Sequence, residues 1–589
     1  NTTPLTIEFT NPTTSLVASG NVEVAKELTV SGNATVSSNL TVGGDVVLSG
    51  NIYNNANLSV QYTTIIPAWT QVGSDIDGEA GSDKSGYSVS MSSDGTRMAI
   101  GAYDNDGTGT SAGHVRVYAE SSGTWTQLGS DIDGEAAGDM SGTSVSMSSD
   151  GTRVAIGADG NAGTNTGAGH VRVYAESSGT WTQVGSDIDG EAADDYSGWS
   201  VSMSSDGTRV AIGAYGNDGN GSDAGHVRVY AESGGAWTKV GNDIDGEAAG
   251  DDSGWSVSMS SDGTRVAIGA RYNDDAGSNA GHVRVYAESG GAWTKVGNDI
   301  DGEAAGDDSG WSVSMSSDGT RVAIGARYND GTGSNAGHVR VYAESSGLWS
   351  QVGNDIDGEA ANDQSGRSVS MSSDGTRVAI GAPYDDGYTG HVRVYAESGG
   401  TWTQVGQDID GEATGDQSGW SVSMSSDGTR MAIGAIRNDG TASDGGHVRV
   451  YDWNSGTSLW TQVGQDIDGE AADDYSGWSV SMSSDGTRVA IGAIRNDGTA
   501  TDAGHVRVFD WPMITGSKKI LKENIVEVSG ELIVSGNVTA GYLYGDGSNI
   551  SGISSNLDQI VNIGNVTSNT VQFSNAITSL TAASNVVVT

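Results

Sequence analysis

The chain has 589 residues, with 91 Gly, 5 Pro, 3 Phe and no Cys, and its formal net charge is −47. Such an excess of negative charge repels nucleic-acid backbones and anionic membrane surfaces, so we expect neither as a direct partner. The lack of cysteine excludes disulfides and thiol chemistry, and no apolar run approaches the 18 residues that indicate a membrane-spanning helix.

Residues 1–66 predict a β-rich stalk segment. LTVSGNATVSSN begins at Leu28, LTVGGDVVLSGN at Leu40 and IYNNANLSV at Ile52, so short apolar stretches recur every twelve residues with SGN-like turns between them. Short strands at a fixed period, separated by Gly and Asn, are typical of a β-solenoid or of an intertwined β-fibre.

Residues 67–514 consist of eight near-identical units. The string SVSMSSDGTR occurs eight times, and its Arg recurs at intervals of 56 residues five times, then 53, then 58. Each unit gives four strand signals: SVSMS, RVAIGA after an Asp-Gly turn, GHVRVYA and WTQVGSDI. Four short strands per unit indicate a propeller blade, and no 3.6-residue apolar period supports a helical solenoid. The sequence therefore predicts an all-β, eight-bladed β-propeller.

The order of the motifs also predicts how the ring closes. A WTQVG strand precedes the first unit at Trp69, whereas the last unit ends at Trp511 without a complete fourth strand. We therefore expect residues 69–77 to supply the fourth strand of the last blade, which removes the open edges of a linear array.

These units resemble FG-GAP repeats, the blades of integrin-α-like propellers, through the pattern SVSMSSDGTRVAIGA, a variable loop, GHVRVY and WTQ. The resemblance covers about residues 67–513. Two features differ from the family: Ser85, Ser197 and Ser253 stand where the family has Phe, and a bare SSDG turn replaces the integrin calcium loop. That turn is too short to surround a cation with six or more oxygens, so the resemblance implies no integrin-type calcium site here.

The histidines and most tryptophans fit structural roles. All eight His begin the third strand of a unit, whereas a catalytic His is normally singular, so a structural role is predicted. Eight Trp lie in the WTQVG-like strands and are predicted to pack between blades. These residues are His114, His170, His226, His282, His338, His391, His447 and His505, and Trp69, Trp125, Trp181, Trp237, Trp293, Trp349, Trp402 and Trp460.

A second aromatic position precedes the first strand and varies between units. Thr143 and Arg367 occupy it in two units, and the others carry an aromatic residue. This variation on a constant background indicates partial exposure and a ring of aromatic side chains at one mouth of the channel, suited to stacking on sugars; the alternative is packing at blade edges. The candidate ligand-binding residues are Tyr87, Trp199, Trp255, Trp311, Trp420 and Trp478.

The DIDGE segment is the candidate metal site, with Ca²⁺ as the candidate cofactor. It recurs in every unit, and DxDG is part of a calcium-loop pattern. The alternative is that these strand-end carboxylates pair with the repeated Arg residues. The candidate ligands are Asp75, Asp77, Glu79, Asp243, Asp245 and Glu247.

The loops between the second and third strands vary most, as in YDNDGTGTSAG and PYDDGYTG, and such loops on a rigid scaffold often carry binding. Relaxed constraint on a solvated loop is the alternative.

Sequons for N-glycosylation are candidate modification sites, although chance matches are expected in Asn- and Ser-rich flanks. They occur at Asn1, Asn33, Asn39, Asn57, Asn220, Asn537, Asn549 and Asn565.

Residues 515–589 predict a second β stalk segment. VEVSGELIVSGNVT, residues 526–539, is identical at ten of fourteen positions to VEVAKELTVSGNAT, residues 22–35, and GYLYGDGSNISGI resembles shaft segments of viral and phage tail fibres. Because ring closure brings both ends of the propeller together, we expect the propeller to be inserted into one stalk.

These features predict a non-enzymatic structural or adhesive component of an extracellular filament or virion surface fibre. The expected partners are further copies of the chain or other filament or particle proteins through the stalk, and surface glycans through the head. Two alternatives remain: a soluble, calcium-dependent module that binds glycan or protein, and a glycan-active enzyme. No carboxylate pair breaks the eightfold repetition, as glycoside hydrolysis would require.

Overall fold

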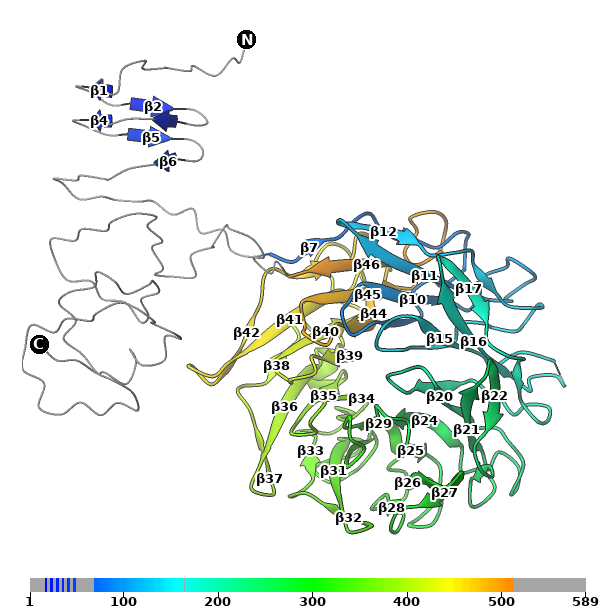
Figure 1. Cartoon of the computed structure of the whole chain (residues 1–589). Coiled ribbons are helices and arrows are strands. Elements are labelled where there is room, and N and C mark those ends of the chain that lie inside the picture. Colours follow the sequence, from blue (N-terminus) through cyan, green and yellow to red (C-terminus); the bar gives the residue numbers. More distant parts are fainter. Residues whose placement is uncertain are drawn as a thin grey trace, which may run out of the picture. The chain divides into compact units, whose positions relative to one another are not determined.

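The computed structural model describes residues 68–163 and 165–511, together with six short strands between residues 16 and 48. The chain divides into two units, one of which is Thr64–Met513 and the other Asn1–Thr63 with Ile514–Thr589. The first unit is a ring of eight antiparallel sheets, which confirms the predicted all-β, eight-bladed propeller (Figure 1).

Each blade begins at the centre of the ring and ends at its rim. Within a blade, neighbouring strands pair in chain order, and the first strands of adjacent blades contact one another around the axis. The first strands are β9 Ser88–Met91, β14 Ser144–Met147, β19 Ser200–Met203, β24 Ser253–Met259, β29 Ser309–Met315, β34 Ser368–Met371, β39 Ser418–Met424 and β44 Ser476–Met482. The second strands are β10 Arg97–Ala102, β15 Arg153–Ala158, β20 Arg209–Ala214, β25 Arg265–Ala270, β30 Arg321–Ala326, β35 Arg377–Ala382, β40 Arg430–Ala435 and β45 Arg488–Ala493.

The third and fourth strands form the outer half of each blade. The third strands are β11 His114–Ser121, β16 His170–Ser177, β21 His226–Ser233, β26 His282–Ser289, β31 His338–Ser345, β36 His391–Ser398, β41 His447–Asn454 and β46 His505–Asp510. The fourth strands are β12 Thr124–Gln127, β17 Thr180–Gln183, β22 Ala236–Lys239, β27 Ala292–Lys295, β32 Leu348–Gln351, β37 Thr401–Gln404, β42 Leu459–Gln462 and β7 Thr70–Gln71. One short helix, α1 Asp385–Tyr388, lies in the loop before β36.

The predicted fourth strand is split into two pieces. A glycine with positive φ, such as Gly129 at +80°, interrupts it, and the chain then forms a two-residue strand that pairs with the start of the same third strand. Only glycine adopts this backbone conformation without strain. The short strands are β13 Ile132–Asp133, β18 Ile188–Asp189, β23 Ile244–Asp245, β28 Ile300–Asp301, β33 Ile356–Asp357, β38 Ile409–Asp410, β43 Ile467–Asp468 and β8 Ile76–Asp77.

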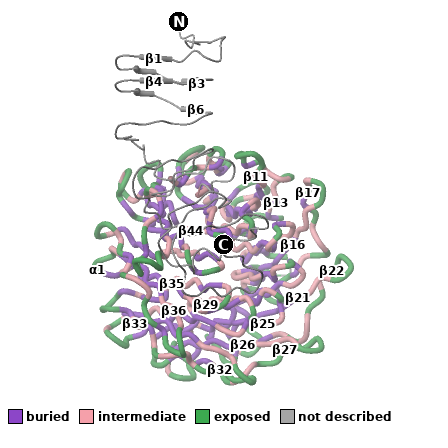
Figure 2. The backbone as a smooth tube through the Cα atoms, turned by 60° about the vertical axis from the view of Figure 1, so that its left-hand side comes forward, coloured by how far each residue is buried: buried purple, intermediate pink, exposed green. Residues whose placement is uncertain are grey.

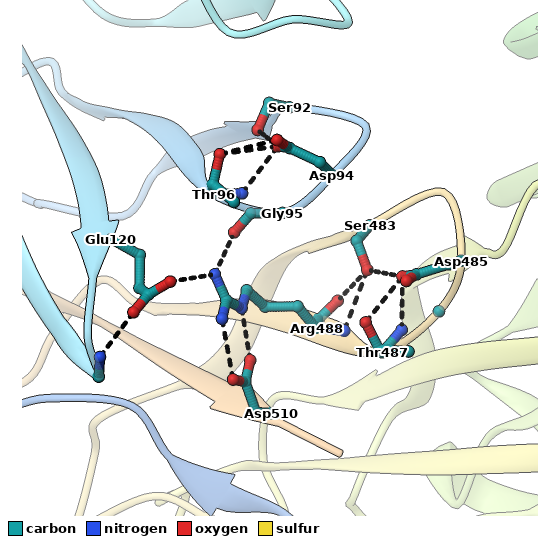
Figure 3. Close-up of polar contacts among 12 residues, drawn as sticks. Ser92, Asp94, Gly95, Thr96, Glu120, Ser483, Asp485, Thr487, Arg488 and Asp510 are labelled. Carbon is teal, nitrogen blue, oxygen red and sulfur yellow. Dashed lines mark hydrogen bonds and ion pairs between the residues drawn. The ribbon is translucent and has the colours of Figure 1, made fainter. Parts of the chain in front are cut away.

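The N-terminal strands close the ring, as predicted. β7 and β8 both pair with β46, with Thr70 opposite Asp510 and Ile76 opposite Val506. Figure 3 shows the same junction on the polar side: Arg488 of blade 8 donates to the carbonyl of Gly95 in blade 1 at 2.8 Å and to Glu120 at 3.3 Å. Closure therefore joins strands from opposite ends of the repeat array.

A continuous ring of backbone hydrogen bonds joins the eight blades around the axis. In each SSDG turn the second Ser donates its N–H to the equivalent carbonyl of the next blade at 2.8–2.9 Å, from Ser93 to Ser149 and onward until Ser484 donates to Ser93. The turns themselves are fixed by the Asp, because Asp94 accepts hydrogen bonds from Ser92 Oγ at 2.7 Å and from the Thr96 N–H at 3.0 Å. The invariant SSDG string therefore both turns the chain and links the blades.

The hydrophobic core lies between neighbouring blades. In one cluster Trp69 packs with Val448 and Val450 of blade 7 and with Ile491 and Phe509 of blade 8. Equivalent clusters repeat around the ring, and Figure 2 shows buried stretches within it and exposed residues in the outer loops. The predicted role of the WTQVG tryptophans in packing between blades is confirmed.

The described N-terminal strands form coils of a β-solenoid. β1 Leu16–Ala18, β2 Val22–Val24 and β3 Leu28–Val30 pair in parallel with β4 Ala34–Val36, β5 Leu40–Val42 and β6 Val46–Leu48. Each pair is offset by 18 residues and strands begin every six residues, so three strands make one coil. The twelve-residue sequence repeat thus contains two strands of the coil. Residues 526–539, predicted to adopt the same conformation, lie outside the described residues.

Candidate binding face at the propeller mouth

The antiparallel register gives the propeller two different faces. The start of the first strand, the end of the second and the start of the third lie at one end of each blade, because Ser88 pairs with Gly101 and Ala102 with His114. The DIDGE segment reaches the same end, since His114 pairs with Asp133. We call this end the loop face and the opposite end, with the SSDG turns, the turn face. Every candidate ligand-binding and metal residue of the propeller therefore lies on the loop face.

The variable aromatic residues come together around the axis. The rings of Trp199 and Trp255 lie 4.8 Å apart and those of Trp255 and Trp311 lie 5.1 Å apart. On the other side of the axis, Trp420 and Trp478 lie 5.2 Å apart, and Tyr87 lies 5.9 Å from Trp478.

All six aromatic side chains are half-buried. We call these six residues and Arg367 the mouth ring. Seven blades contribute a planar group to it, and Thr143 in blade 2 is the gap.

Two further arginines, which the sequence analysis did not single out, stack on the mouth ring. The guanidinium of Arg271 lies 3.2 Å from the centre of the Trp255 ring and 5.3 Å from that of Trp311, while Arg327 lies 3.2 Å from Trp311. Arg367 stacks on Trp420 at 3.7 Å. The signal was present in the sequence, because the RYND loops of two blades place Arg directly after AIGA, beside the Trp of the same blade.

Several of these cations have no carboxylate partner within the described residues. Arg271 and Arg327 pair with Asp252 at 2.9 Å and Asp308 at 3.3 Å. Arg367, Arg437 and Arg495 form no ion pair, and the latter two are exposed beside Tyr475. In a chain of net charge −47, the mouth therefore presents guanidinium groups that a ligand can pair.

The histidines are buried at the boundaries between blades, farther from the axis. His338 is 1% exposed, and burial together with Arg340 lowers its pKa to about 4. Burial is also the leading cause that lowers the pKa of His114 to about 4 and the pKa of His226 to about 3. These imidazoles are therefore neutral at pH 7, in agreement with the predicted structural role.

The DIDGE carboxylates are divided between two neighbouring clusters. Asp75 accepts a hydrogen bond from Gln71 at 2.6 Å and lies near Glu470 and His505. Asp77 lies 3.9 Å from His505, whereas Glu79 lies 3.9 Å from His114 of the next blade. The three acids of one segment are thus not brought together as one calcium loop.

The second DIDGE candidate is divided in the same way. Asp243 pairs with Lys239 at 2.6 Å and Asp245 lies 3.9 Å from His226, while Glu247 lies 3.8 Å from His282 and 3.6 Å from Arg284. Carboxylate and guanidinium groups do meet here, as the ion-pair alternative predicted.

Asn220 is the one candidate glycosylation site within the described residues. It is exposed, and its side-chain amide donates to the Gly246 carbonyl at 2.8 Å. The sequons at Asn1, Asn33, Asn39, Asn57, Asn537, Asn549 and Asn565 lie outside the described residues.

The fold and its repeats define an eight-bladed β-propeller closed by an N-terminal strand. The family model of the FG-GAP repeat matches residues 186–230, 244–286, 300–342, 408–451 and 466–509. These five segments are therefore FG-GAP repeats, as the resemblance implied. No curated protein matches the chain.

Solved structures with a similar fold have low sequence identity. Sqt1 from Chaetomium thermophilum is 15% identical with a TM-score of 0.48, covering 74% of this chain and 99% of that one. The same protein bound to the N-terminus of ribosomal protein L10 is 16% identical with a TM-score of 0.47, covering 74% of this chain and 100% of that one. A periplasmic gluconolactonase, PpgL, of Pseudomonas aeruginosa is 15% identical with a TM-score of 0.38, covering 60% of this chain and 92% of that one. Among the residues that the structure describes, no helix is long and apolar enough to cross a bilayer.

Proposed function

We propose that this protein is a non-enzymatic adhesive component of an extracellular filament or virion surface fibre, with the propeller as its binding head. The observation that carries the proposal is the mouth ring, in which seven blades contribute a planar side chain around the axis. The ligand class is a surface glycan that contacts several blades at once.

The chemistry of the mouth ring supports this ligand class. Indole rings offer flat apolar faces on which the C–H faces of sugars can stack, and stacked aromatic pairs set the scale of such a contact at about 0.5–1.5 kcal/mol beyond burial of area. Individually weak contacts add when one ligand spans several sites in the right geometry. Unpaired guanidinium groups at Arg437 and Arg495 add the capacity to bind carboxylate or sulfate groups.

The stalk supports the fibre part of the proposal. The first and last coils of a solenoid expose unpaired strand edges unless another coil or another chain covers them. A segment of this kind therefore favours self-association or assembly with other filament proteins. The strong negative charge keeps such a particle soluble and away from anionic surfaces. Localisation outside the cell or on a particle surface is part of this proposal.

A triple substitution in the mouth ring tests the proposal. Replacing Trp199, Trp255 and Trp311 with Ala should weaken binding to glycans or cells by about tenfold or more, because loss of ~1.4 kcal/mol corresponds to one decade in affinity. The measurement is glycan-array and cell-binding titration of the full chain, with circular dichroism to verify the fold.

The matched control uses three rim tryptophans of the same blades. Trp237, Trp293 and Trp349 lie in the fourth strands, and replacing them with Ala should leave binding of the folded protein unchanged. Equal binding by the wild type and the mouth variant would eliminate the mouth ring as the binding surface. If the wild type binds no glycan or cell, the adhesive function is wrong.

A further inference from the structure

A small pocket lies on the loop face at the boundary between blades 4 and 5. It is lined by Glu303, Gln351, Gly353, Asn354, Asp355 and Asp357. Glu303 extends from the segment after β28 in blade 4, whereas the other residues belong to blade 5. Its acidic side chains are accessible to solvent, since those of Glu303 and Asp357 are 44% and 43% exposed.

A buried histidine without a hydrogen-bond partner faces these carboxylates. His338 is 1% exposed, and neither of its ring nitrogens has a partner. Its Nδ1 lies 3.7 Å from Glu303 Oε2 and 3.9 Å from Asp357 Oδ1. One oxygen of Asp355 completes a group of three donor atoms that all lie within 4.8 Å of one another. Burying a polar group without a hydrogen-bond partner is unfavourable, so an arrangement of this kind is stabilised by a ligand between the donors.

We infer that His338, Glu303 and Asp355 bind a divalent first-row metal ion of the Zn²⁺ type. The His338 Nδ1–Glu303 Oε2 distance of 3.7 Å and the 4.8 Å within which all three donor atoms lie need a moderate contraction to reach the edge of about 3.4 Å that tetrahedral Zn²⁺ with ~2.1 Å bonds requires. Ca²⁺ fits less well, because it prefers six or more oxygen ligands and this group includes an imidazole nitrogen.

The charges around the pocket favour a dication. The three carboxylates of Glu303, Asp355 and Asp357 face two guanidinium groups. Arg340 Nη1 lies 3.9 Å from Glu303 Oε1, the carboxylate oxygen that points away from the imidazole, and Arg393 donates to the backbone carbonyl of Asp357. Gln351 donates to Asp355 Oδ1 at 2.6 Å, which fixes this carboxylate and leaves its other oxygen available. Hydrogen bonding to the second carboxylate oxygen is how proteins orient metal ligands.

The same group of donors recurs around the ring. Which Asp belongs to it depends on the residue that pairs with the first Asp of the DIDGE segment. The described residues contain seven groups of this kind, among them Glu79–His114–Asp131 and Glu135–His170–Asp187. In blade 4, Lys295 replaces the Gln and its ammonium contacts both oxygens of Asp299 at 2.7 and 2.9 Å. There the third member of the group is Asp275, from the loop, instead of Asp299.

Equilibrium dialysis of the full chain tests the inference. After treatment with EDTA, the wild type should take up Zn²⁺ at several sites per chain, and Glu303→Gln should take up one fewer. Gln351→Lys, which places an ammonium on Asp355 as in blade 4, should also lose one. Zinc X-ray absorption should show imidazole and carboxylate ligation. Both substitutions are at solvent-accessible positions, so the fold and the other sites act as internal controls.

Glu344→Gln is the matched control and should retain every ion. Glu344 lies in blade 5, as His338 and Asp355 do, but it pairs with Arg265 on the turn face. Three results would overturn the inference: no uptake of Zn²⁺ by the wild type, as expected if water alone occupies the pocket; full uptake by Glu303→Gln; or displacement of Zn²⁺ by a modest amount of Ca²⁺. None of these results depends on glycan binding, so this inference and the adhesive function fail separately.

Discussion

At the scale of single residues, the second-strand Arg keeps a partner in the next blade even where the repeat sequence changes. In most blades the second-strand Arg donates to a Gly carbonyl and to a Glu of the next blade, as Arg97 does to Gly151 and Glu176. Blades 7 and 8 carry Trp453 and Trp511 where that Glu would be. Arg377 and Arg430 instead lie 5.7 and 5.6 Å from those indole rings, so a cation–π contact replaces the carboxylate.

Acidification should destabilise the metal-free propeller below pH 6.5. Burial lowers the pKa of His338 to about 4, whereas the unfolded chain has the ordinary value of 6.5. Between these values the unfolded state binds more protons, so the free energy of unfolding falls as the pH falls, by up to ~1.4 kcal/mol per pKa unit and histidine. Denaturant unfolding of EDTA-treated protein at several pH values measures this.

The carboxylates around the same histidine limit the pH window of that prediction. Burial raises the pKa of Glu303 and of Asp357, so these groups gain protons first in the folded state and oppose the loss at the acidic end. The decline should therefore be clearest just below pH 6.5, before these carboxylates begin to gain protons. Stability that is constant or rising from pH 6.5 to 5.5 would show that the histidines are not held neutral.

At the scale of elements, two short strands hold the ends of the ring together. β7 pairs with β46 over two residues only. Its neighbour Trp69 is 3% exposed, packs in the cluster between blades 7 and 8, and donates from Nε1 to the Val463 carbonyl at 2.7 Å. Side-chain packing therefore adds to the backbone pairing in fixing this closing strand.

Replacing Trp69 with Ala should be among the most destabilising single substitutions in the propeller. A large aromatic residue removed from a core costs about 3–5 kcal/mol, and here a hydrogen bond is lost as well. Trp237→Ala is the comparison, because Trp237 is half-buried and its Nε1 has no partner. Thermal unfolding should show a clearly larger loss of Tm for the Trp69 variant, and equal losses would contradict the closing role.

At the scale of the whole molecule, the propeller contains its own closure. The ring of Ser hydrogen bonds runs through all eight blades and returns to Ser93. The described hydrophobic clusters draw only on residues of the propeller. The hydrogen-bond ring and these clusters lie within the compact unit Thr64–Met513, so the propeller has the properties of an independently folding unit.

A pair of fragments should demonstrate this independence. Residues 64–513 should fold alone with the Tm of the propeller transition in the full chain, because both closing strands are present. Residues 78–513 lack β7 and β8, leave β46 as an open edge, and should unfold at a much lower temperature or aggregate. Scanning calorimetry and light scattering measure both outcomes. A low Tm for the longer fragment would show that the flanks support the ring.

The sequence by itself determined the blade count, the strand order and the closure, because each is carried by a local pattern that recurs eight times. SVSMSSDGTR marks a hairpin wherever it occurs. The strand at Trp69 precedes the first unit, so it can pair only with the last unit, which lacks a complete fourth strand. The packing role of the eight rim Trp and the structural role of the eight His followed from the same repetition. Local propensity and period suffice for such features.

Only the tertiary structure decided which side chains meet. The acids of DIDGE are adjacent in sequence, yet the strand alternation and the blade boundary send Asp75 to one histidine and Glu79 to another. Arg271 likewise stacks on Trp255 of its own blade and lies near Trp311 of the next blade. The sequence spacing of these residues does not predict this contact between blades. Contacts between repeats depend on the radius and twist of the closed ring, which are properties of all eight blades together.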